Sequence, residues 1–238
     1  MGRPDQGITL RVSRLDGNPG IEIRTAEWLA EYFFFTNASS VRLGTYTPWD
    51  AYTAAPTLAE VNRIVLSDIT AINQSMAART GHKHWQALRD AGDLPWLAAL
   101  DPAWDLIQMT DGEWIQNRVE ERIGEAVDRV VGPWRGLSVT TKVLATKRPR
   151  LVPILDELVI RQVGGRNDPT WARRLVSHVR QIGLENLSEL QAIDRHLRGC
   201  EPPIERPLAR ILDALLWSST PGLIPYSQFT RLLTKAAT

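Results

Sequence analysis

The chain has 238 residues, of which 43% are hydrophobic and 23% charged, a composition that is typical of globular proteins and excludes a disordered chain. Its net charge of +1 excludes a global basic field, so any nucleic acid would have to bind at a local patch. The single cysteine excludes an intramolecular disulfide and a thiolate cluster for zinc or iron–sulfur. We find no signal-peptide pattern and no apolar stretch of membrane-spanning length, and therefore expect a soluble, cytoplasmic protein.

The first part of the chain is expected to form a short β-hairpin. Apolar and polar residues alternate over 8–12 and again over 21–23, on either side of the turn-forming sequence DGNPG. From Thr25 the spacing of apolar residues becomes helical, and residues 36–56 are rich in Asn, Ser, Thr, Gly and Pro, which indicates a loop.

Helical periodicity accounts for most of the remaining chain. Thr57 and Glu60 form a capping-box pattern, which predicts the start of a long helix that ends near Ala78. Asp111 is expected to cap a helix that ends before the Gly-Pro pair at 132–133. Further helices are expected over residues 82–91, 93–100, 102–108, 138–147, 154–163, 169–183, 188–198, 205–218 and 226–235.

These elements predict a mainly all-α fold with a short N-terminal β-hairpin. About ten helices with short links are too many for one simple bundle, so we expect two packed layers or lobes with a cleft. We interpret residues 1–238 as a single helical domain with sub-lobes 1–110 and 111–238.

The stretch from residue 134 to 165 carries most of the chemical information. It contains a turn at Gly136, a basic helix, a connector stiffened by Pro149 and Pro153, and Asp156 at the start of the next helix. The first turn of the basic helix presents unpaired backbone N–H groups, which suit a phosphate. The run from residue 142 to 150, which we call the basic run, holds four cations and no acidic residue: Lys142, Lys147, Arg148 and Arg150.

This pattern, within segment 114–163, resembles the helix-hairpin-helix superfamily of DNA glycosylases. Its members have a Gly-rich hairpin, a Lys-Thr-Ala-like helix start and a Pro-x-x-x-Pro-Val-Asp sequence. The counterparts here are Gly136, Val139-Thr140-Thr141, and Pro149 with Pro153-Ile154-Leu155-Asp156. The chain also resembles an uncharacterised bacterial family, catalogued as a domain of unknown function, with the core K-x-L-x-x-K-R-P-R-L-x-P-x-x-D.

The resemblance implies an enzyme that flips a damaged or modified base out of duplex DNA and cleaves its N-glycosidic bond, without a cofactor. The modified base could be one that phages carry, so both DNA repair and defence against foreign DNA remain open. Two other functions also remain open, namely a non-catalytic DNA-binding module and a helical interaction domain with no nucleic-acid role.

The resemblance also implies roles for individual residues. Asp156 would stabilise the positive sugar as the bond breaks, and its alternative role is to cap a helix. Lys142 would be either a Schiff-base nucleophile or a phosphate contact. Val139 takes the position of the family's lysine, which favours a monofunctional enzyme. The expected DNA contacts are Gly136, Thr140, Thr141, Lys147, Arg148 and Arg150, with a solvated surface as the alternative for the cations.

Aromatic residues near this stretch and in the polar loop are candidates to stack on a flipped base. They are Trp134, Tyr46, Trp49 and Tyr52, and ordinary packing or anchoring is the alternative for each. His82 and His84 have no acidic or cysteine partner at a useful spacing, so no metal site is expected.

Overall fold

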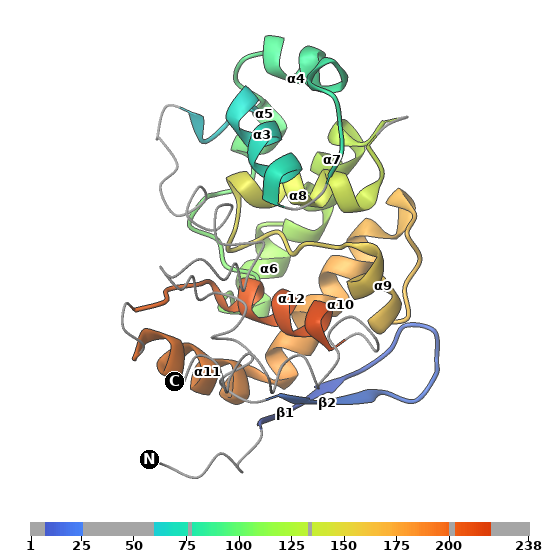
Figure 1. Ribbon diagram of the computed structural model, residues 1–238, viewed down its shortest axis with the longest axis vertical. Helices are drawn as coiled ribbons and strands as arrows, with labels where there is room; N and C mark the ends of the chain where they lie inside the picture. Colours follow the sequence, from blue (N-terminus) through green and yellow to red (C-terminus); the bar gives the residue numbers. More distant parts are fainter. Residues whose placement is uncertain (1–7, 26–59, 76–77, 133–134, 200–202, 220–238) are drawn as a thin grey trace, which may run out of the picture.

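A computed structural model describes residues 8–25, 60–75, 78–132, 135–199 and 203–219 (Figure 1). The described residues are mainly α-helical and include a two-stranded antiparallel sheet, which confirms the predicted fold class. The predicted helix over 226–235 and the polar loop over 36–56 lie outside them. No helix in the described part is long and apolar enough to cross a membrane.

The N-terminal hairpin forms as predicted and packs on the helices. Strands β1 (Ile8–Val12) and β2 (Ile21–Thr25) pair with Leu10 opposite Ile23. Leu10, Val12 and Ile23 are buried, because the alternation of a strand turns all three to one face. Strand β2 continues through Thr25, where helical spacing was expected to begin.

Ten α-helices occur within the described residues: α3 (Leu66–Ser75), α4 (Gln86–Asp90), α5 (Pro95–Ala98), α6 (Asp111–Gln116), α7 (Val119–Val130), α8 (Leu137–Lys147), α9 (Glu157–Gln162), α10 (Ala172–Glu185), α11 (Leu187–Arg198) and α12 (Leu208–Ser218). The short 3₁₀ helices η2 (His82–Trp85) and η3 (Pro169–Trp171) precede α4 and α10.

Two predicted helices start later or do not form, and side-chain carboxylates explain both differences. The helix expected from Thr57 begins at Leu66, where Asp68 accepts a 2.8 Å hydrogen bond from the backbone N–H of Val65. The helix expected over 102–108 is a series of turns. Asp105 closes them by accepting 3.0 Å hydrogen bonds from the backbone N–H groups of Ile107 and Gln108.

The helix predicted over 111–131 is divided into α6 and α7. Arg118 lies between them in the left-handed conformation with φ of 50°, which interrupts the helical hydrogen-bond ladder. The cap at the start of α6 is Thr110 and not Asp111, because the Thr110 hydroxyl accepts from the N–H of Glu113 and the Glu113 carboxylate accepts from the N–H of Thr110.

The helices gather in two groups that share one apolar core. Helices α3, α4, α5, α7 and α8 lie together at one end, and α9 to α12 lie at the other end with the sheet (Figure 1). Helix α10 packs on both α7 and α12, and buried apolar side chains from β1 to α12 form one continuous cluster.

Asn186, at the end of α10, holds the β-hairpin on the helices. Its side-chain oxygen accepts a 2.7 Å hydrogen bond from the N–H of Arg11, and its amide nitrogen donates to the carbonyl of Arg11 at 2.8 Å. Farther along the hairpin, the N–H of Leu15 donates to the carbonyl of Val163 at 2.9 Å. The hairpin is thus fixed by residues that follow it by 148 positions or more.

Candidate functional site

Helices α7 and α8 pack against each other and are joined by a tight hairpin. The backbones of Gly132 and Arg135 exchange two hydrogen bonds, of 3.2 and 2.9 Å, across the turn. Gly136 is the N-cap of α8 and provides no side-chain cap, and a Cβ built on it would meet no heavy atom within 4 Å. The hairpin therefore leaves the first-turn N–H groups of α8 without a side-chain cap from Gly136.

Thr140 and Thr141 are buried, so the prediction that they contact DNA is wrong. The Thr140 hydroxyl donates to the carbonyl of Arg135 at 3.3 Å. The Thr141 hydroxyl donates to the carbonyl of Leu137 at 3.1 Å and accepts from the N–H of Leu155 at 3.1 Å. These threonines position the α7–α8 hairpin and fasten the connector to α8, one residue before Asp156.

Lys147 is also an internal residue and not a phosphate contact. Its side chain is 5% exposed, and its ammonium group pairs at 2.7 Å with the carboxylate of Asp68, which is fully buried on α3. A charged group in this position is stabilised by its partner and cannot reach a ligand in solvent without breaking the pair.

Arg148 is buried at the C-cap of α8, and all five of its N–H donors are used within the protein. Its guanidinium donates to the carbonyls of Leu97, Leu100, Val61 and Lys147 and to the side-chain oxygen of Asn62. No donor remains for a phosphate, so the predicted DNA contact is wrong. Burial lowers the pKa of Arg148 to about 10, which leaves it charged at neutral pH.

Arg150 and Lys142 remain closer to the surface. Arg150 is 49% exposed and pairs with Asp105 at 3.2 Å. Lys142 is half-buried on α8, and burial lowers its pKa while the charges of Asp156 and Asp213 raise it. No acidic residue lies within residues 142–150 of the sequence, but the fold brings acidic partners to these cations. The partners come from α3, from the turns before α6 and from the group of helices α9 to α12.

Asp156 lies at the start of α9, as predicted. One carboxylate oxygen, Oδ1, accepts hydrogen bonds from the N–H groups of Leu158 at 3.0 Å and Val159 at 3.1 Å, so the residue is the N-cap of this helix. The side chain is half-buried, and within the described residues its other oxygen, Oδ2, has no hydrogen-bond partner.

A second carboxylate, Asp213 of α12, lies near Asp156 and Lys142. Asp213 is buried and forms a close ion pair with Arg210 one turn earlier. Burial raises the pKa of Asp213 to about 7, Arg210 and Lys142 oppose the rise, and Asp156 adds to it. Helices α9 and α12 pack on each other, and so three helices bring one ammonium group and two carboxylates within electrostatic reach. We call Lys142, Asp156 and Asp213 the carboxylate–lysine cluster.

Asp213 was not predicted as a site residue, although the sequence of α12 contains a signal for it. The helix LARILDALLWS is almost entirely apolar except for Arg210 and Asp213, which are three residues apart and hence on one face. Charged residues are rarely buried unless they are paired, so a charged pair in an otherwise apolar helix indicates a candidate functional site.

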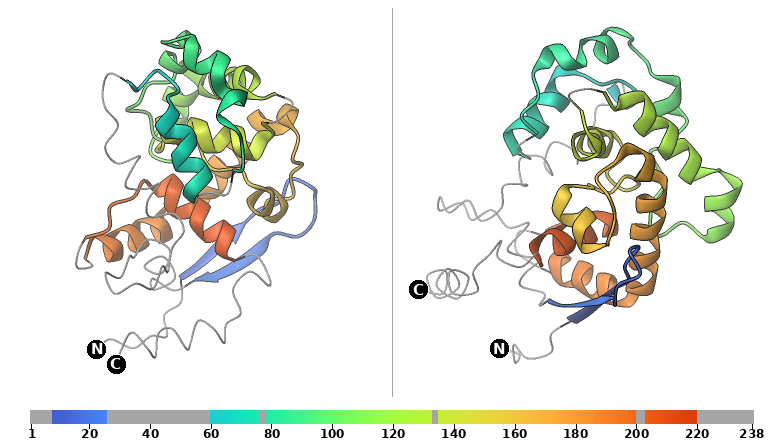
Figure 2. Two further views of the ribbon diagram at one scale, coloured as in Figure 1. Left: turned by 45° about the horizontal axis from the view of Figure 1, so that its top comes forward. Right: turned by 90° about the vertical axis from the view of Figure 1, so that its right-hand side faces the viewer.

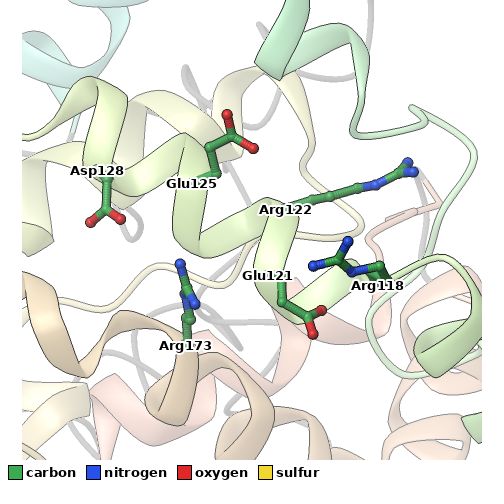
Figure 3. Close-up of a pocket in the computed structure, with 6 residues that line it drawn as sticks. All are labelled: Arg118, Glu121, Arg122, Glu125, Asp128 and Arg173. Carbon is green, nitrogen blue, oxygen red and sulfur yellow. The ribbon is translucent and has the colours of Figure 1, made fainter.

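Two surface hollows lie away from this cluster. One of about 400 Å³ lies between α7 and α10 and is lined by Arg118, Glu121, Arg122, Glu125, Asp128 and Arg173. Arg173 points from α10 toward α7 there (Figure 3), across Gly124, where a Cβ would overlap it. The other, of about 240 Å³, includes Trp104, Asp105 and Arg150. Neither hollow is lined by Asp156 or Lys142, so the predicted cleft at Asp156 is not among them.

The other predicted site residues have mixed outcomes. Trp134, Tyr46, Trp49 and Tyr52 lie outside the described residues. His84 accepts a 3.2 Å hydrogen bond from the N–H of Gly81 through Nδ1. In the described part of the chain, no group of three or more His, Cys, Asp or Glu residues could hold a metal ion.

The sequence matches a protein family of unknown function, DUF6308, over residues 25–220. This range includes the α7–α8 hairpin, the connector and all three members of the carboxylate–lysine cluster. No curated protein and no solved structure matches the chain.

Proposed function

The chain belongs to DUF6308, a family of unknown function, and we propose that it is a monofunctional DNA glycosylase, which flips out a damaged or modified base and hydrolyses its N-glycosidic bond. The observation that carries the proposal is the carboxylate–lysine cluster at the end of the connector that follows the α7–α8 hairpin. The resemblance to helix-hairpin-helix glycosylases assigns the hairpin to DNA and Asp156 to the chemistry.

The chemistry requires a negative charge beside the sugar. When the bond between the sugar carbon and the base nitrogen breaks, positive charge develops on the sugar, and water then adds its oxygen to that carbon. The half-buried carboxylate of Asp156 is suited to stabilise this charge, because solvent screens it less than an exposed one. Its Oδ2 atom is the oxygen that α9 does not use.

Two neighbouring residues would influence the Asp156 carboxylate: Asp213 by gaining or losing a proton, and Lys142 by its positive charge. With a pKa of about 7, Asp213 exchanges its proton near neutral pH, whereas an ordinary aspartate would be fully ionised. Lys142 supplies a compensating positive charge, and it is the residue that would form a covalent intermediate if the enzyme also cleaved the strand.

The second candidate function is a DNA-binding module without catalysis, and the capping role of Asp156 favours it. Oδ1 already satisfies two backbone N–H groups of α9, which is a sufficient structural reason for an aspartate at this position. The two functions differ in one respect that can be measured, namely whether the negative charge of Asp156 is needed for base release.

The test incubates the protein with duplex DNAs that carry different modified bases and then treats them with alkali to break the strand at abasic sites. We expect breaks only after alkali, as for a monofunctional enzyme. Asp156→Asn should lower base release by more than tenfold and leave DNA affinity and stability nearly unchanged, because asparagine caps a helix as well as aspartate does. Retention of more than a tenth of the activity would limit the contribution of the charge to about 1.4 kcal/mol, too little for this role.

Glu157→Gln is the matched control. Glu157 is the next residue, is exposed, and pairs with Arg161 on the surface of α9 at 2.9 Å, so the substitution removes the same charge from the same helix start. Base release by this variant should stay within about twofold of wild type, since exposed pairs contribute little. An equal loss in both variants would attribute the effect to the helix terminus in general.

A further inference from the structure

The burial of Lys147 and Arg148 removes two of the cations expected to hold DNA, so other cations must do so if the chain acts on DNA. A different cationic feature lies between α9 and α10. Arg166 and Arg174 both stack on Trp171, with guanidinium carbons 5.4 and 5.0 Å from the centre of the indole ring. We call these three residues the Trp171 patch.

The two arginines of the Trp171 patch are exposed, and their donors are not used within the described protein. Neither side chain forms a hydrogen bond or an ion pair there, and the electrostatic partner of Arg166 is Asp168. Asp168 also caps η3, because its Oδ1 accepts from both the N–H and the hydroxyl of Thr170. The other three arginines that stack on tryptophan in the described residues also donate to backbone carbonyls: Arg122 to Ala99, Arg135 to Val130 and Arg180 to Met109.

The backbone that carries the patch is held in a defined shape. Pro169 begins η3, the N–H of Trp171 donates to the carbonyl of Asp168 at 2.9 Å, and Gly165 donates to the carbonyl of Ile160 at 2.9 Å. Stacking on an indole ring holds each guanidinium in place, so its donors are aligned before a ligand arrives. Two aligned and exposed guanidinium groups suit the oxygens of adjacent phosphates.

The patch also lies on the face that the proposed function would turn toward DNA. Figure 2 (right) shows the N-terminal end of α8, helix α9 and the start of α10 on the same side of the molecule. Gly136 is the N-cap of α8, and Asp156 is the N-cap of α9. The neighbouring Arg173 differs from the patch, because it points toward α7, where Glu121 and Asp128 also line the hollow (Figure 3).

We propose that the Trp171 patch binds the phosphodiester backbone of duplex DNA, with Arg166 and Arg174 as the phosphate contacts and Trp171 as the residue that positions them. This inference rests on the proposed function for its choice of partner. It assigns DNA binding to the start of α10, whereas the sequence pattern assigned it to the basic run at 142–150.

The test measures equilibrium binding of the full chain to a labelled, unmodified DNA duplex over a range of KCl concentrations. Each phosphate contact contributes about −0.9 to the slope of log K against log salt concentration. At about 0.15 M salt, one such contact raises the affinity about fivefold relative to its value at 1 M salt. Arg166→Gln and Arg174→Gln should each flatten the slope by about this amount, and the double variant by about twice as much. Both residues are exposed, so the variants should keep the wild-type melting temperature.

Arg195→Gln is the matched control, because Arg195 is an exposed arginine of α11, which lies at the lower left of Figure 1, whereas α10 begins at the right. Its substitution should leave the slope unchanged. Wild-type slopes in both patch variants would overturn the patch and leave base release by Asp156 untouched. Patch-dependent binding without base release from any modified duplex would uphold the patch and overturn the glycosylase. Tighter binding to single-stranded RNA than to duplex DNA, lost in the same variants, would overturn duplex DNA as the partner.

Discussion

Replacing Arg148 with methionine separates a structural role from a DNA-binding role. The guanidinium connects three parts of the chain, since it donates to Val61 and Asn62 before α3, to Leu97 and Leu100 around α5, and to the end of α8. Methionine has a similar length and no donors, so the substitution removes the hydrogen bonds with little change in volume.

We expect Arg148→Met to lower the free energy of unfolding by about 3–5 kcal/mol, the usual cost of disrupting a buried polar network. Hydrogen bonds from a charged donor contribute about 1.5–3 kcal/mol each. The variant no longer has to bury the guanidinium charge, and this saving in desolvation energy offsets part of the lost hydrogen-bond energy. For a chain of this size, about 2–4 °C is lost per kcal/mol, so the melting temperature should fall by about 10 °C.

Urea and thermal denaturation measure this loss, and DNA affinity is then measured well below the lowered melting temperature. Arg150→Met is the control, because Arg150 is half-exposed with a single partner, Asp105, and should cost no more than about 1 kcal/mol. A loss below about 1 kcal/mol for Arg148→Met, together with weakened DNA binding, would refute the structural role and restore the phosphate contact.

Two further predictions concern buried charges. Lys147→Met should lower the free energy of unfolding by about 3–5 kcal/mol, because it leaves Asp68 buried without its cation. In urea denaturation, adding Asp68→Asn should recover part of this loss. Equal stabilities of the single and double variants would contradict a coupled pair. The raised pKa of Asp213, about 7, means that the unfolded state ionises first as the pH rises, so this group lowers stability progressively between about pH 4 and pH 7. Asp213→Asn should have the flatter stability profile over that interval, and a parallel profile would show that Asp213 keeps an ordinary pKa.

The sequence was sufficient for features that depend on neighbouring residues. The alternation around DGNPG predicted the hairpin, and helical spacing with Gly136 predicted α8 to within one residue of its start at Leu137. Asp156 was placed correctly at a helix start because a capping residue acts on the N–H groups two and three positions later.

The sequence was insufficient where partners come from distant parts of the chain. Lys147, Arg148 and Arg150 form a run without acids, yet the acid that pairs with Lys147 is 79 residues away, and Arg150 pairs with Asp105 at a separation of 45. Charge in a sequence window therefore does not distinguish a buried pair from a surface patch. The same limitation concealed Asp213, whose relation to Asp156 exists only because α9 and α12 pack together.

The attachment of the β-hairpin through Asn186 has a consequence for biosynthesis. A two-stranded hairpin is at best marginally stable by itself in water, and the partners of this one are made 148 to 175 residues after it. At about 5–20 residues per second, a ribosome needs on the order of ten seconds or more to add that length. During this interval the apolar side chains of Leu10, Val12 and Ile23 have no helical surface to cover them. Strands β1 and β2 are thus made well before the residues that hold them in place, and the nascent protein depends on these later residues to bury the hairpin.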